Sequence, residues 1–152
     1  MNLIKVCILM ITGVFSTYLM ADDPFFQASL TPEFAIHTKS QMIKGVSVSV
    51  WGENPQSSCA FGFINGTKND SMGAMFGLVN YSEKYSGAQF SILNTSEQMK
   101  GAQCGLINRS KTADPVFQFG FINIIESNKI WFKDFPYSLA PIMILVNWKI
   151  KK

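Results

Sequence analysis

The sequence predicts an all-β protein that folds as a short β-solenoid-like stack of 14–15-residue repeats. Two observations lead to this prediction. A segment of about eight residues recurs through the chain and ends each time in Asn, as a repeat architecture requires. Within each copy, apolar residues alternate strictly with small or polar ones, which is the period of a β-strand and not of a helix.

The copies follow one another from the first third of the chain to its end. The three most regular are Gly73–Asn80, Gly87–Asn94 and Gly101–Asn108, and Ser58–Asn65 and Val116–Asn123 fit the same frame. The more divergent outer copies are Gly45–Gly52 and Ala140–Asn147. Divergent ends are expected to cap a repeat array, because its first and last units face solvent. The segments between copies, 66–72, 81–86, 95–100 and 109–115, are rich in Ser, Asn, Asp, Thr and Lys and predict turns.

The two faces of each predicted strand differ in character. Positions two, four and six carry the apolar side chains, as in Ala88, Phe90 and Ile92. On the opposite face, position three is often Gln and position five is Gly or Ser. Recurrent glycine in a strand indicates close approach of another backbone or surface. We interpret this strip as a packing feature between repeats, with a ligand groove as the alternative.

Three architectures fit this pattern. In a solenoid, like residues stack on like residues, and the recurrent Asn would form a ladder in which each amide bonds the next at roughly 4.8 Å. An eight-stranded antiparallel barrel, counting Phe25–Ile36 as a strand, is the alternative. Its copies would be short of the about 9–11 residues of a membrane strand. A sandwich is the third possibility, and the solenoid is favoured.

The amino-terminal residues predict export. Lys5 precedes an apolar run, Val6–Leu19, and Ala21 stands just before an acidic pair, as in a cleavable signal peptide. An uncleaved membrane anchor is the alternative. We therefore expect residues 1–21 to be a signal peptide and residues 22–152 a single β-repeat domain.

The cysteines provide a test of the architecture. Cys59 and Cys104 lie on the same predicted face, three repeats apart. In a solenoid this separation is near 14 Å, beyond the roughly 7 Å Cα limit of a disulfide. We predict free thiols.

Composition and motifs argue against several functions. The formal net charge is +3 and the basic residues are scattered, so a nucleic-acid interface is not expected. His37 is the only histidine, and no cysteine or carboxylate stands at metal-ligand spacing around it. No nucleophile elbow and no phosphate-binding loop is present. We expect no catalytic residue, no metal and no cofactor.

The copies resemble a known repeat. Gly73–Asn80, Gly87–Asn94 and Gly101–Asn108 resemble the GLQxGLxN-type surface repeats of exported bacterial proteins, and Gln118–Asn123 follows the same pattern. The present chain uses Ala at position two, where the family favours Leu, and ends in Lys-Ile-Lys-Lys where the family ends in an aromatic residue. The resemblance implies a bacterial source and an envelope or secreted location, and it brings no catalytic residues.

These observations favour a non-catalytic structural or interaction protein of the bacterial envelope, exported to the periplasm, the cell surface or the medium. A small outer-membrane barrel is the alternative, and an unrecognised enzyme a third hypothesis. The partner would be a protein, a glycan or an envelope component, and membrane association is possible. The aromatic insert between residues 126 and 139 is interpreted as a cap over the end of the array, or as a contact. Six residues form the predicted contact surface: Gln89, Gln103, Gln118, Trp131, Phe132 and Tyr137.

Overall fold

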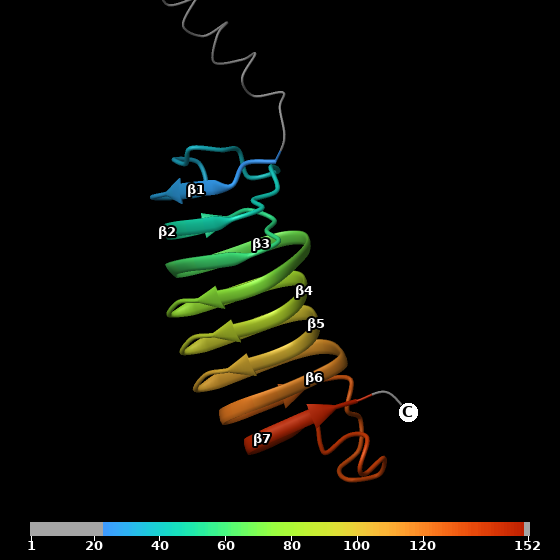
Figure 1. Ribbon diagram of the computed structural model, residues 1–152. Coiled ribbons are helices and arrows are strands. Elements are labelled where there is room, and N and C mark those ends of the chain that lie inside the picture. The colour runs from blue at the N-terminus through green and yellow to red at the C-terminus, as the bar shows by residue number, and fades with distance from the viewer. Residues whose placement is uncertain (1–22, 151–152) are drawn as a thin grey trace, which may run out of the picture.

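The computed structural model describes residues 23–150 and shows a parallel β-solenoid of about five turns (Figure 1). The predicted signal peptide, residues 1–21, lies outside the described residues. The strands are β1 (Phe26–Ser29), β2 (Val46–Glu53), β3 (Cys59–Phe76), β4 (Val79–Phe90), β5 (Leu93–Cys104), β6 (Ile107–Ile125) and β7 (Ile142–Lys149). They form one sheet in chain order, and β1 to β6 pair in parallel. The solenoid prediction is confirmed, and the barrel and sandwich alternatives are wrong.

Each coil of the solenoid has two sides. In β4, residues 80–86 run along one side, the chain turns at Gly87, and residues 88–92 return along the other. Gly87 has φ +142° and a Cβ there would overlap the carbonyl oxygen of Gly73 in the preceding coil, so the turn requires glycine. Gly101 occupies the same corner one coil later.

The segments that the sequence predicts as turns are strands. Tyr81–Ser86 lies within β4 and pairs residue by residue with the equivalent part of β5, as in Ser82 with Ser96. Similarly, residues 109–113 lie within β6. Polar composition suggested loops because the outer side of these strands is charged, while their inner residues are Ser, Met and Ala. The correction is that the repeat is one coil with two strand segments.

The last copy also departs from the prediction. Ala140–Asn147 was expected to add a further parallel repeat, but β7 runs antiparallel to β6, with Asn147 opposite Gln118. The insert before β7 reverses the chain direction. β7 therefore covers the edge of the final coil on one side, at the end of the stack opposite β1 (Figure 1).

The interior is largely polar, and asparagine amides bond from coil to coil along the stack. The amide of Asn65 donates to Asn80 (3.0 Å), Asn80 to Asn94 (3.1 Å), Asn94 to Asn108 (2.9 Å) and Asn108 to Asn123 (2.8 Å). The predicted asparagine ladder is confirmed. Apolar side chains complete the interior, and these core residues are Ala60, Met75, Tyr85, Met99, Ala113, Val116 and Ile125.

Candidate functional site: an apolar face

One outer side of the solenoid is apolar over its whole length. Its side chains form three columns that cross the strands, with one residue from each coil. The corner column is Val46, Cys59, Ala74, Ala88, Ala102 and Phe117. The central column is Val48, Phe61, Phe76, Phe90, Cys104 and Phe119. The far column is Val50, Phe63, Leu78, Ile92, Leu106 and Phe121. We call these three columns the apolar face.

The aromatic rings of the central column are stacked in order. The ring centroids of Phe61 and Phe76 are 5.1 Å apart, and those of Phe76 and Phe90 are 5.0 Å apart, with nearly parallel planes. Each ring nevertheless stays exposed, between 37 % and 43 % of its surface. Phe121 in the far column is 67 % exposed. Stacking along the column therefore leaves the outward side of every ring open to solvent.

The extent of the face exceeds that of an ordinary surface patch. Seven of its phenylalanines are between 37 % and 67 % exposed. With about 200 Å² for each side chain, they alone present roughly 700 Å² of apolar surface. The largest apolar patch of a typical monomer is roughly 300–600 Å². An apolar surface of this size indicates a binding surface.

The opposite outer side is charged. Ion pairs join neighbouring coils there: Lys68 with Glu53, Lys84 with Asp70, Lys111 with Glu97, and Arg109 with Glu126. The hydrogen bond from Lys111 lowers the pKa of the Glu97 carboxyl. Near one corner, burial raises the pKa of Tyr81 to about 12, and its hydroxyl donates to Glu53. This charged face has the composition of a solvated surface.

A hollow lies at the β1 end of the apolar face. The loop after β1 brings Leu30, Phe34 and Ile36 beside Val50 and Phe63, around a cavity of 680 Å³. Phe34 is 74 % exposed although it borders this cavity. The loop therefore extends the apolar face with a concave end.

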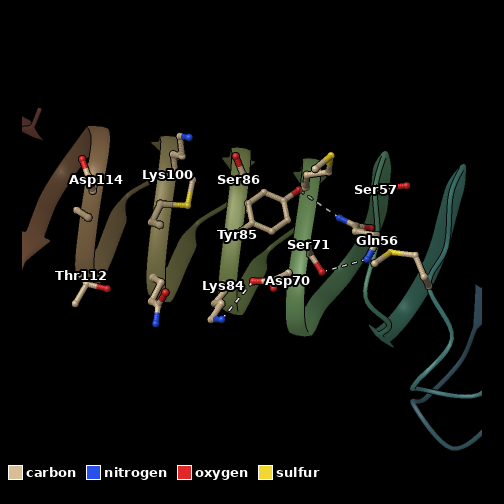
Figure 2. A pocket seen from close by; sticks show the side chains of 15 residues that line it. Gln56, Ser57, Asp70, Ser71, Lys84, Tyr85, Ser86, Lys100, Thr112 and Asp114 are labelled. Carbon is tan, nitrogen blue, oxygen red and sulfur yellow. Dashed lines mark hydrogen bonds and ion pairs between the residues drawn. The ribbon is translucent and has the colours of Figure 1, made fainter. Parts of the chain in front are cut away.

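A second hollow, of 540 Å³, crosses the coils on the charged side (Figure 2). Its floor contains Ser71, Tyr85 and Met99, and its rims carry charged residues such as Lys84 and Lys100. Gln56 donates from its side chain to the Tyr85 hydroxyl at 3.3 Å, and Ser71 accepts from the Gln56 backbone at 3.1 Å. Burial raises the pKa of Tyr85, so the hydroxyl stays neutral. The floor groups thus bond to one another.

The predicted contact surface is half wrong. Gln89, Gln103 and Gln118 have no exposed surface and lie inside the coil. Gln103 donates to Gln89 and Gln118 donates to Gln103, each at 2.8 Å, so the strip is a second interior amide ladder and offers nothing to a partner. The packing interpretation of the strip agrees with this position.

The aromatic rings of the insert are exposed. Trp131 is 58 %, Phe132 is 52 % and Tyr137 is 40 % exposed. The insert is tied to β7 by Trp148, whose indole N–H donates to the carbonyl of Pro136 at 2.8 Å. Leu139, at the end of the insert, is buried, and the following strand β7 pairs with the last coil. The structure does not bring the insert and the glutamines together.

Sequence reasoning missed the phenylalanines of the central and far columns as site residues. The signal was present, because all six residues of each column are apolar. The apolar face can be recognised as the outer one only when the other face of each strand is known to be covered by a second strand segment of the same coil. From the sequence alone, that second segment is interpreted as a turn.

Among residues 23–150, the histidine, cysteine and acidic side chains are dispersed. No group of three histidine, cysteine, aspartate or glutamate side chains there could hold a metal ion. His37 lies near Gln27, whose side chain accepts from the His37 backbone N–H at 3.0 Å. In the same residues no helix is long and apolar enough to cross a membrane. Cys59 and Cys104 are both free, as predicted.

Comparison of the chain with family models, with curated proteins and with solved structures finds no match.

Proposed function

We propose that this chain is a non-catalytic interaction protein, exported to the bacterial envelope or secreted, that binds through its apolar face. The single observation that supports this most strongly is the exposure of three apolar columns on one side of the solenoid, while the opposite side carries ion pairs. An exposed apolar surface larger than the patches of ordinary monomers marks a binding surface or an interface.

The architecture suits this role. Neighbouring coils are held by amide ladders and by backbone pairing, so the columns are fixed in a flat array. A rigid, preorganised surface loses little conformational entropy when it binds, which favours affinity. The predicted export signal and the resemblance to surface repeats support the envelope or the medium as the place of action.

Site-specific photo-crosslinking tests the proposal. A photoreactive phenylalanine replaces Phe90, at the centre of the apolar face, and in a matched variant replaces Gln98, on the charged face. After irradiation of the producing cells, we expect adducts of higher mass from position 90 and not from position 98. If position 90 gives no adduct, the apolar face is not a binding surface and the proposal is wrong.

A further inference from the structure

We propose that the occupant of the apolar face is a second copy of this chain, packed face to face as a two-fold dimer. The inference rests on the proposed function and names the partner for the same surface. Three observations carry it: the area of the face, the relief of its columns, and the position of the basic residues.

The area is that of a stable interface. The exposed phenylalanines contribute roughly 700 Å², and five aliphatic side chains on the same columns, Val48, Val50, Leu78, Ile92 and Leu106, are each about half exposed. Together they exceed the about 800 Å² that each partner buries in a standard interface. Two flat sheets that meet through such a surface pack roughly 10 Å apart, as in a sandwich.

The relief of the face is self-complementary. The middle of the corner column is small, with Ala74, Ala88 and Ala102, whereas the far column is bulky at the same coils, as with Leu78 and Ile92. A two-fold axis along the stacking direction, over the central column, places the small column of one copy opposite the bulky column of the other. Under the same axis the central phenylalanines meet their own counterparts. The geometry thus satisfies the isologous rule of a two-fold interface.

The position of the basic residues distinguishes a second copy from a lipid surface. Interfacial membrane binding normally combines an apolar face with lysine and arginine around it. None of the eighteen residues in the three columns is basic. Lys68, Lys84, Arg109 and Lys111 lie on the opposite side, each with a carboxylate partner. The columns themselves therefore carry no charge that attracts a membrane, and they are suited to a matching apolar sheet.

The two native cysteines provide a matched test of this arrangement. Cys104 lies in the central column and would face the same residue of the second copy across the sheet spacing, roughly 10 Å. Cys59 lies in the corner column and is displaced by two column widths from its counterpart, which gives a separation of roughly 16 Å. A bis-maleimide that spans no more than the sheet spacing should therefore join Cys104 and not Cys59.

The experiment uses the full chain with Cys7→Ala in every variant. The single-cysteine variant with Cys59→Ala should give a covalent dimer in high yield, and the one with Cys104→Ala only a small fraction of it. Light scattering of the uncrosslinked protein should give twice the chain mass. Phe90→Glu should reduce the mass to that of one chain, whereas Gln98→Glu on the charged face should leave it unchanged. Because Phe90→Glu adds a charge to the stack, Phe90→Ser and circular dichroism serve as a check on folding.

Each outcome separates this inference from the proposed function. A single-chain mass, together with adducts from position 90 to another molecule, overturns the dimer and leaves the binding surface intact. A single-chain mass with no adduct from position 90 removes both. Cross-linking through Cys59 in place of Cys104 overturns the two-fold arrangement.

Discussion

At the scale of single residues, the interior of the coil depends on amides that bond along the stack. Asn94 accepts from Asn80 and donates both to Asn108 and to the carbonyl of Cys104, at 3.0 Å. Its side chain has no exposed surface, so water cannot replace these bonds. A buried polar group without a hydrogen-bond partner costs roughly 1–3 kcal/mol of stability. Substituting one asparagine of the ladder should therefore destabilise the fold by more than the loss of its side-chain volume suggests.

Asn94→Ala is expected to lower the free energy of unfolding by about 3 kcal/mol, because it removes the acceptor for the Asn80 amide in the preceding coil and the donor to the Asn108 amide in the next. Gln98→Ala, on the exposed side of the same coil, should change it by less than about 0.5 kcal/mol. Urea unfolding followed by circular dichroism gives both values. Equal effects of the two substitutions would show that the ladder contributes little.

The buried Tyr85 makes the stability depend on alkaline pH. Burial raises its pKa above the roughly 10 of an exposed tyrosine, so the unfolded chain loses this proton before the folded one. The stabilisation is fully present below pH 10 and declines as the pH rises toward the folded-state pKa. Tyr85→Phe should be somewhat less stable at pH 8, since it loses the bond from Gln56, but should lose less stability above pH 10 than the unsubstituted chain. Urea midpoints at several pH values test this, and parallel profiles would contradict it.

The alternation of side chains was predictable from the sequence, but the side that turns inward was not. Phe90 and Gln89 are adjacent, and the usual preference for apolar cores would bury the phenylalanine. The coil buries Gln89, whose amide donates to Ser82 and accepts from Gln103 inside the stack, bonds that a phenylalanine could not make. The asparagine ladder was predicted correctly because identity between neighbours has a direct physical reason in a parallel stack.

At the scale of elements, the coil rather than the strand is the unit of the fold. Gly87 pairs with Gly101, Asn80 with Asn94, and the residues between them keep the same register. The sequence predicted the apolar half of each coil and missed the polar half, since Ser, Glu and Lys on a charged outer side resemble a loop. It could not predict the reversal at β7, because Ala140–Asn147 carries the same alternation as the parallel copies.

The coil can be removed as a unit. Deletion of residues 87–100 joins Ser86 to Gly101 and keeps every column in register, so the chain should fold with one coil fewer and a lower urea midpoint. Deletion of residues 87–99 places Lys100 at the corner that needs glycine and turns the side chains beyond it to the opposite face. We expect this variant to lack the β-sheet signal in circular dichroism. Equal behaviour of the two deletions would contradict a stack of equivalent coils.

At the scale of the whole molecule, the two outer sides differ in character. The charged side keeps ion pairs in water, and the apolar side offers a flat surface that ends in the hollow beside Phe34. The two ends of the stack also differ. At one end the loop after β1 folds back on the sheet, where Ile36 donates from its backbone to Ala28 at 3.0 Å. At the other end β7 alone reverses the strand direction.

The antiparallel direction of β7 should stop the solenoid from growing end to end. Without it, the edge of β6 between Val116 and Ile124 exposes unpaired backbone groups in a parallel stack, and the first coil of another chain could extend it. A chain that ends at Ser138, with Phe90→Glu to prevent pairing through the apolar face, should therefore form elongated particles visible by electron microscopy. The control is the full chain with Phe90→Glu and Trp131→Ser, which keeps β7 and should stay at the mass of one chain. If the truncated chain also stays at that mass, the edge is protected by another part of the molecule and β7 is not the terminator.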